Sequence, residues 1–241
     1  MLKCKESRLF IVGGAADECY SEFLRLAGGK HAHIVVLSHA SAEPRKSGDA
    51  VKASLKALGA TNVTVLTPRK SGSLEADVEA VFMAGGDQSR LVRLLDKQGL
   101  SEQLRHAWRR GVLVGGSSAG AAACAPTMIA GGMTDGVLRH GSLLLEKGLC
   151  LLPNVIVDTH FAQRDRCNRL RAAVATLAGT IGVGLDEDTA LLIEGRKARV
   201  FGAGRVHVCS RDQVSQSTDW QEIATASIAL SFDAGQSFLI G

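Results

Sequence analysis

The 241-residue chain contains few aromatic residues, no closely spaced cysteine pairs and no long hydrophobic run. Phe, Trp and Tyr make up only 4% of the residues, which argues against a β-sandwich packed with aromatic rings. No apolar segment is long enough to span a bilayer, and the first ten residues lack the apolar core of a signal peptide. These absences favour a cytoplasmic protein with no membrane partner.

Cysteines and basic residues are also too scattered to form familiar binding motifs. The six cysteines include no C-x-x-C pair, and there is no H-E-x-x-H pattern, so we expect free thiols in a reducing compartment and no metal site. The 28 Lys and Arg residues exceed the 24 Asp and Glu residues by only four, without a dense basic run. A nucleic-acid partner is therefore not expected.

What the chain does contain is an alternation of short apolar segments with amphipathic ones. This pattern predicts an α/β fold with a doubly wound, mostly parallel sheet and helices on both faces. In the first half we predict strands at 8–12, 33–38, 62–66, 80–84 and 112–114, and helices at 16–27, 44–58 and 88–110, the last interrupted at position 99.

The second half has a looser pattern. We predict a loop-rich excursion over 126–153, a strand at 155–158, a helix at about 164–177, and an apolar segment at 181–185. A terminal strand meander follows at 189–193, 198–201 and 206–209, and the last thirty residues, with a polar loop at 215–218, end in similar short strands. We find neither an internal repeat nor a linker, so residues 1–241 are expected to form a single domain.

Residues 112–123 read Val-Leu-Val-Gly-Gly-Ser-Ser-Ala-Gly-Ala-Ala-Ala and contain the nucleophile-elbow pattern G-x-S-x-G. Ser118 would lie at the apex of a tight strand-to-helix turn, where glycines two residues before and after it avoid backbone collisions. The alternative is a small-residue turn used for packing or phosphate binding. Three glycine pairs are expected at the carboxyl edge of the sheet and favour a shared cleft there, namely Gly13-Gly14, Gly85-Gly86 and Gly115-Gly116.

A serine nucleophile needs a base and an acid that orients the base. Of the seven histidines, His160 stands just past a strand end, on the edge where Ser118 is expected, so we predict it as the base. Asp135 and Glu187 both fit as the acid, and spacing does not choose between them. Asp158 is too close in sequence to His160 to be an obvious partner.

Three arginines follow the predicted base, at positions 164, 166 and 169. Arg166 and Arg169 are three residues apart and share a helix face, while Arg164 lies at the helix start. Guanidinium groups beside a catalytic base suggest a substrate carboxylate, held in bidentate fashion. The alternative is a set of surface charges paired with Asp165 and Glu187.

Five blocks of sequence carry a resemblance to a known family. They are Phe82-Met-Ala-Gly-Gly-Asp-Gln-Ser-Arg-Leu91, Gly116-Ser-Ser-Ala-Gly-Ala121, Met128-Ile-Ala-Gly-Gly132, Asp158-Thr-His-Phe-Ala-Gln-Arg-Asp-Arg-Cys-Asn-Arg-Leu170 and Gly184-Leu-Asp-Glu-Asp-Thr-Ala190. In this order they resemble the cyanophycinases of serine peptidase family S51. The resemblance implies a flavodoxin-like sheet related to class I glutamine amidotransferases. It also implies hydrolysis of cyanophycin to β-Asp-Arg dipeptides without a cofactor. Cyanophycin is a poly-aspartate backbone with arginine on each β-carboxylate.

The resemblance also implies residue roles. It makes Ser118 the nucleophile and His160 the base, and it favours Glu187 over Asp135 as the acid. The positions that match the family's substrate pocket are Gln88, Asp158, Thr159, Arg164, Arg166 and Arg169. We further expect main-chain N–H groups of Gly85, Gly86 and Ala119 to form the oxyanion hole.

Two positions depart from the family pattern. Thr159 stands where the family usually has glutamine, and Ser117 stands where threonine is more usual. The first departure keeps open an aspartyl or isoaspartyl dipeptidase of the same family. The alternative outside the enzymes is a module that binds an anionic ligand without catalysis. An enzyme with a thiol nucleophile is disfavoured, because Cys124 lies in the helix after the elbow. The apolar sheet edges are compatible with a homodimer.

Overall fold

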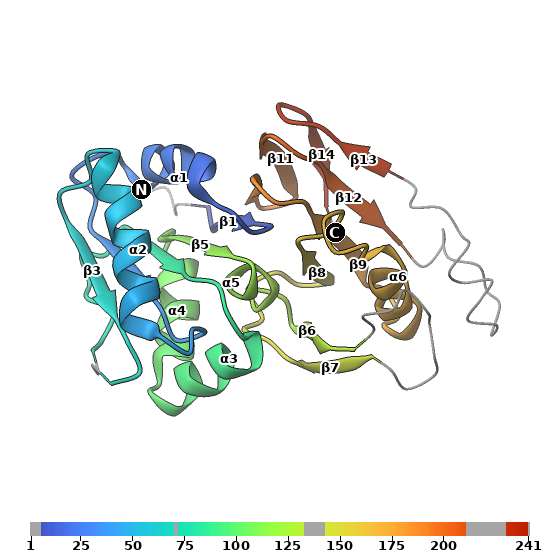
Figure 1. Ribbon diagram of the computed structural model, residues 1–241, viewed down its shortest axis with the longest axis horizontal. Coiled ribbons are helices and arrows are strands. Elements are labelled where there is room, and N and C mark those ends of the chain that lie inside the picture. The colour runs from blue at the N-terminus through green and yellow to red at the C-terminus, as the bar shows by residue number, and fades with distance from the viewer. Residues whose placement is uncertain (1–5, 70–71, 133–142, 211–229, 241) are drawn as a thin grey trace.

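The computed structural model describes residues 6–69, 72–132, 143–210 and 230–240. Its central sheet has eight strands in the order β14-β11-β10-β1-β5-β4-β2-β3 (Figure 1). The five parallel strands are β1 (Arg8–Val12), β5 (Leu113–Ser117), β4 (Ala80–Met83), β2 (Ile34–Leu37) and β3 (Val63–Leu66). Most of these residues are apolar and buried, as expected for strands covered on both faces. The predicted mostly parallel α/β sheet is confirmed.

Helices cover both faces of this sheet because successive strand residues point to opposite sides. Phe10 and Val12 of β1 belong to one apolar core, and Leu9 and Ile11 belong to the other. The first core is covered by the short 3-10 helix η1 (Asp17–Cys19), α1 (Tyr20–Ala27) and α2 (Pro44–Ala57), and the second by α3 (Gln88–Lys97) and α4 (Leu100–Arg109). These helices agree closely with those expected from the apolar periodicity, including the break at Gly99.

A second sheet of four strands lies beside the central one, on the right in Figure 1. Its order is β13-β12-β9-β8, and its strands are β8 (Val155–Thr159), β9 (Ile181–Leu185), β12 (Val206–Cys209) and β13 (Leu230–Phe232). Helix α6 (Cys167–Thr176) packs on it through Leu170 and Val174, which contact the same core as Ile156.

The sequence suggested that all of these strands belong to a single sheet. In the structure, the strand at 155–158 lies in the second sheet, and the terminal meander is divided between the two sheets. Strands β10 (Thr189–Glu194), β11 (Lys197–Gly202) and β14 (Ser237–Leu239) extend the central sheet, with β10 antiparallel to β1. Strand β10 fills the edge of the central sheet beside β1. Strands β8 and β9 therefore cannot pair there. They pair with each other in parallel, and β12 joins β9 instead.

Two further segments differ from the prediction, and a third cannot be compared with it. The expected excursion at 126–153 contains an antiparallel pair, β6 (Thr127–Gly131) and β7 (Leu144–Lys147). The helix expected from about Arg164 begins at Cys167, since Asp165 has a φ of 46° that no α-helix accommodates. The polar loop at 215–218 lies outside the described residues.

The elbow strand is longer than predicted. We expected it to end before Gly115, but β5 continues through Gly115 and Gly116 to Ser117. A Cβ on Gly115 would lie 2.7 Å from the Phe23 ring and 2.9 Å from the Phe82 ring. The expected glycine pair at the end of this strand therefore lies inside it, and neighbouring rings occupy the space that a side chain at Gly115 would need.

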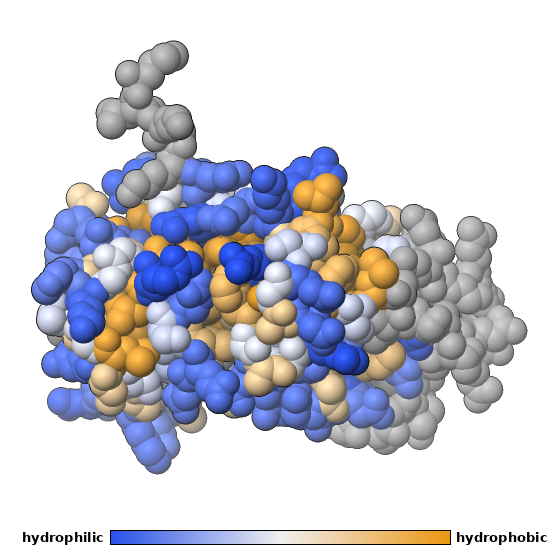
Figure 2. All heavy atoms as spheres, turned by 90° about the horizontal axis from the view of Figure 1, so that it is seen from above, coloured by the Kyte–Doolittle hydropathy of each residue, from blue (hydrophilic) through white to orange (hydrophobic). Residues whose placement is uncertain are grey.

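Hydrophobic side chains gather along the middle of the face shown in Figure 2, with hydrophilic ones around them. Among the described residues, the large hydrophobic side chains that are exposed belong to Leu58, Leu144, Leu230 and Leu239. None of the described helices is both long enough and apolar enough to cross a bilayer.

Candidate active site

Ser118 lies at the turn between β5 and the short helix α5 (Ala119–Ala122). Its φ of 52° and ψ of −110° are unusual for a residue with a side chain. Two glycines make this turn feasible, since a Cβ on Gly116 would lie 2.5 Å from the Gly120 carbonyl carbon and one on Gly120 would lie 2.4 Å from the Met83 carbonyl oxygen. The geometry is that of a nucleophile elbow, with the strain concentrated at the serine.

A glycine loop after β1 brings two other segments to this turn. Gly13 accepts a hydrogen bond from the His160 N–H at 2.7 Å, and Gly14 accepts one from the Asp188 N–H at 2.9 Å. A Cβ on Gly14 would lie 2.2 Å from the His160 ring, and one on Gly13 would lie 2.0 Å from the Asp186 carbonyl oxygen. The loops after β1, β8 and β9 therefore meet closely because these two positions lack side chains.

The side chains of Ser118, His160 and Glu187 form a continuous hydrogen-bonded series. His160 Nε2 lies 2.8 Å from Ser118 Oγ, and His160 Nδ1 lies 2.6 Å from Glu187 Oε1. With its proton on Nδ1 facing the carboxylate, the neutral imidazole accepts the serine proton at Nε2. The structure thus brings together the predicted nucleophile, base and acid, while the alternative acid Asp135 lies outside the described residues.

The electrostatic environment keeps this imidazole ready to accept a proton. Burial lowers the pKa of His160 below its ordinary value, and the charges of Arg164 and Arg166 act in the same direction. The hydrogen bond to Glu187 opposes them without reversing the shift. The neutral, proton-accepting form therefore dominates at neutral pH.

Asp186 supports the site, although no role for it was predicted from the sequence. It is buried, and its two oxygens accept hydrogen bonds from the Ala162 N–H at 3.0 Å and the Arg205 N–H at 3.1 Å. Although burial raises its pKa, the hydrogen bond from His207 and those from the two N–H groups lower it overall. The carboxylate joins the loop that follows His160 to the loop that carries Glu187, a link between distant segments that no local pattern reveals.

The predicted oxyanion-hole groups lie next to the serine. A Cβ on Gly85 would lie 3.4 Å from Ser118 Cβ, and Gly86 follows with a φ of 142°. Ala119 is the first residue of α5, so its N–H has no acceptor within the helix. These positions stay predictions for the oxyanion hole, and α5 contributes little dipole because it has only four residues.

The three arginines predicted for the pocket have different environments. Arg166 Nη1 lies 3.1 Å from Asp158 Oδ1 and 2.6 Å from the Thr159 carbonyl oxygen, while Arg169 Nε lies 2.8 Å from Asp158 Oδ2. Burial lowers the pKa of Arg166, against the opposing charge of Asp158. Arg164 is exposed, and its side chain has no hydrogen-bond or ion-pair partner among the described residues. Arg164 is therefore the guanidinium most available to a ligand.

The remaining predicted pocket residues are largely occupied by protein contacts. Asp158 is only 2% exposed and holds the two arginines, and Thr159 is 4% exposed. Gln88, the first residue of α3, donates from Nε2 to the Ile129 carbonyl oxygen at 2.6 Å. Asp158 is placed to position the arginines rather than to reach a ligand itself.

Cys124 lies just beyond α5, not within it as we expected. Its thiol is buried and lies 3.3 Å from the Gly120 carbonyl oxygen, and burial raises its pKa to about 12. A protonated thiol in this position cannot act as a nucleophile.

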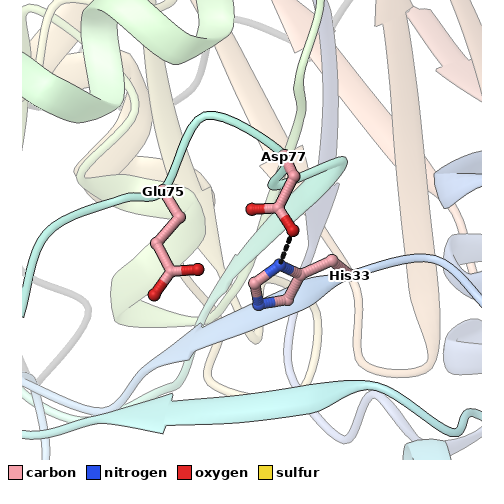
Figure 3. A group of neighbouring side chains, drawn as sticks. All are labelled: His33, Glu75 and Asp77. Carbon is pink, nitrogen blue, oxygen red and sulfur yellow. Dashed lines mark ion pairs between the residues drawn. The ribbon is translucent and has the colours of Figure 1, made fainter.

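One group of potential metal ligands occurs among the described residues, formed by His33, Glu75 and Asp77 (Figure 3). Their ligand atoms lie within 4.8 Å of one another, and His33 Nδ1 lies 3.3 Å from Asp77 Oδ2. His33 precedes β2, and the two acidic residues precede β4. The group is thus at the amino edge of the parallel strands, opposite the Ser118 turn, and takes no part in the candidate site.

Comparisons with known proteins identify the family of this chain. The model of peptidase family S51 matches residues 9–201. A cyanophycinase from Synechococcus elongatus is 36% identical over 219 residues, which cover 85% of this chain and 68% of that protein. A cyanophycinase from Geminocystis herdmanii is 34% identical over 239 residues, covering 93% and 88% of the two chains.

Solved structures show the same fold at lower sequence identity. A peptidase from an acI-B1 Actinobacterium superposes with a TM-score of 0.72 and 19% identity, covering 98% of each chain. A peptidase E-type protein from Listeria monocytogenes EGD-e superposes with a TM-score of 0.60 and 16% identity, covering 83% of this chain and 100% of that one. The chain belongs to peptidase family S51 and is a serine-type peptidase.

Proposed function

We propose that this peptidase hydrolyses cyanophycin to β-Asp-Arg dipeptides, with Ser118 as the nucleophile, His160 as the base and Glu187 as the orienting acid. The observation that carries the proposal is the hydrogen-bonded series from Ser118 through His160 to Glu187, next to the exposed guanidinium of Arg164. The identity of 34–36% to proteins named cyanophycinase supports the choice of substrate.

The chemistry proceeds through an acyl-enzyme. Ser118 Oγ attacks the carbonyl carbon of the scissile peptide while its proton moves to His160 Nε2, and Glu187 stabilises the resulting imidazolium. N–H groups at Gly85, Gly86 and Ala119 would stabilise the oxyanion, each contributing about 3 kcal/mol to the barrier reduction. The carbon–nitrogen bond then breaks, and the leaving amine takes the proton from His160.

Water completes the cycle. His160 removes a proton from a water molecule that attacks the ester, and the same proton returns to Ser118 Oγ as the ester bond breaks. The second product leaves as a carboxylic acid, and the starting protonation state is restored. The chain's own residues supply every proton transfer in this scheme.

Substrate selection rests on carboxylate recognition. Each arginine of cyanophycin is attached to the backbone through its α-amino group, so its own α-carboxylate is free. Arg164 is exposed near His160 and suits such a carboxylate, while Asp158 fixes Arg166 and Arg169 beside it.

The test is mass spectrometry of products after incubation of the protein and its Ser118→Ala variant with cyanophycin and with α- and β-aspartyl dipeptides. We expect β-Asp-Arg from the polymer with the parent protein and none with the variant. Cleavage of dipeptides alone would move the assignment to the aspartyl dipeptidase that the Thr159 departure keeps open. No reaction with any substrate would contradict the proposal.

A further inference from the structure

We propose that a basic groove between α2 and β3 binds a second stretch of the cyanophycin chain while another part of that chain is cleaved at Ser118. This inference rests on the proposed function for its ligand. It assigns to the protein a polymer-binding site outside the catalytic residues.

The groove is a cavity of about 830 Å³ at the edge of the central sheet. One wall is a single face of α2, because Arg45, Asp49 and Lys52 have the i, i+4, i+7 spacing of residues that lie in a row. The other wall is formed by β3, the last strand of the sheet, and by Arg69 just after it. Its volume falls within the range of ordinary ligand sites.

The charge of the groove is strongly one-sided. Arg45, Lys52, Arg69 and Arg90 line it, against a single carboxylate from Asp49. None of the four cationic side chains has a hydrogen-bond or ion-pair partner elsewhere in the described chain, and Arg90 Nε is buried without one. A buried donor without an acceptor is costly, so a ligand oxygen at this position would be stabilising.

The beginning of α2 adds to this positive character. Pro44 and Arg45 both line the groove, and Pro44 is the first residue of the helix. The N-cap residue is Glu43, whose carboxylate is paired with Lys46, while the first turn contains no acidic residue and no described side chain caps its N–H groups. The helix dipole of this 14-residue helix therefore acts together with the four cationic side chains to attract an anion.

One end of the groove lies at the same sheet edge as the candidate active site. Because β2, β3, β4 and β5 are parallel, the segments that follow them are at one edge of the sheet. A Cβ on Gly85 would lie 3.4 Å from Ser118 Cβ, and one on Gly86 would lie 2.5 Å from the Ala40 carbonyl oxygen. Ala42 and Arg90, which lie close to these positions in sequence, line the groove. An extended chain anchored at Ser118 can follow this edge into the groove.

Cyanophycin has the chemistry to occupy such a groove. Each repeat carries one free carboxylate and one guanidinium at a regular interval along an extended backbone. The cationic side chains suit the carboxylates, and Asp49 suits a guanidinium. A substrate of one β-Asp-Arg unit has no further repeat to place in the groove, so we expect the groove to distinguish the polymer from short substrates.

Steady-state kinetics with two substrates test the proposal. The groove variant is Arg45→Gln, Lys52→Gln, Arg69→Gln, and the matched control is Lys97→Gln, Arg109→Gln, Arg110→Gln, which removes three exposed positive charges from α3 and α4. For the groove variant we expect the KM for cyanophycin to rise about tenfold with kcat retained, since three exposed charge contacts are lost. The two-repeat peptide (β-Asp-Arg)₂ should be cleaved as by the parent protein. Equal polymer KM values for the groove and control variants would overturn the proposal.

A binding assay keeps this test separate from the proposed function. The Ser118→Ala protein, with and without the groove substitutions, is mixed with cyanophycin, and the fraction that co-sediments is measured. We expect about tenfold weaker binding with the groove substitutions and unchanged binding with the control substitutions. Equal binding would overturn the groove proposal even if the parent protein hydrolyses cyanophycin. A difference in binding would support it even if hydrolysis by Ser118 is disproved.

Discussion

Two hydrogen-bonded series in the protein each contain a serine, a histidine and an acidic residue. They are Ser118, His160 and Glu187 at the elbow, and Ser231, His207 and Asp186 in the second sheet. In the second series the serine lies 3.0 Å from the imidazole and the carboxylate lies 3.3 Å from it. A serine, an imidazole and a carboxylate are thus linked in the same order, with the two ring nitrogens exchanged between the series.

The backbone around the two serines is what differs. Ser231 is in β13 and pairs with His207 of β12 in a regular antiparallel ladder. Ser118 has a positive φ and lies in the turn that leads into α5. The turn at Gly85 lies beside it. Of the two serines, only Ser118 therefore lies at a strand-to-helix turn, beside the N–H groups that we predict to stabilise an oxyanion. Side-chain chemistry alone does not make a nucleophile, and the comparison predicts that only the elbow series reacts.

The largest expected effect separates the two serines. Ser118→Ala should lower kcat for peptide hydrolysis by about 10,000-fold, because it removes the attacking oxygen. Ser231→Ala should change kcat less than about twofold, since it removes an exposed hydrogen bond in a strand. Initial rates with both variants measure this, and a comparable loss in the two would contradict the distinction.

A second prediction concerns the glycine loop that brings His160 to Ser118. Gly14→Ala should lower kcat about 100-fold or more, because the added methyl would displace the imidazole that it meets at 2.2 Å. Gly29→Ala is the matched control, since Gly29 also has a positive φ, 88°, but a Cβ there would meet no described atom within 4 Å. Similar losses of kcat in the two variants would show that backbone strain, not contact with His160, is responsible.

The acid of the second series should matter for stability. Asp186→Asn presents an amide to N–H donors and should lower the free energy of unfolding by about 2 kcal/mol. Asp233→Asn, which breaks an exposed ion pair with Arg205, should cost less than about 0.5 kcal/mol. Urea denaturation measures both values, and equal costs would contradict the positioning role of Asp186.

The smallest effect is a shift in pH dependence. Activity should fall as the pH decreases through the pKa of His160, because the protonated imidazole cannot accept the serine proton. Arg164 lowers this pKa, so Arg164→Gln should move the acidic limb of kcat/KM to higher pH. Arg205→Gln, whose charge is paired with Asp233, should leave the limb in place. A limb that moves to lower pH in Arg164→Gln would contradict the electrostatic account.

The sequence predicted those parts of the fold that depend on local pattern. The parallel strands, the helices and the G-x-S-x-G turn follow from apolar periodicity and glycine spacing, and all are present. The second sheet was missed because strand pairing depends on which edge is free, and β10 closes the edge beside β1. Gly115 was misplaced because its role is to make room for Phe23 and Phe82, which are distant in sequence.

The candidate site was predicted unevenly for similar reasons. Ser118 and His160 each follow a strand end, so a local pattern could identify them. Glu187 depended on family resemblance, because spacing left Asp135 as an equal choice. Asp186 and the basic groove went unnoticed, since their importance arises from contacts between loops and helices that only the folded chain brings together.

Labelling with a fluorophosphonate probe tests the account most directly. The parent protein, Ser118→Ala and Ser231→Ala are each treated with the probe, and the modified residue is located by peptide mass spectrometry. We expect a single adduct at Ser118 in the parent protein and in Ser231→Ala, and none in Ser118→Ala. An adduct at Ser231, or an unmodified Ser118 in the parent protein, would contradict the claim that the elbow makes Ser118 the nucleophile.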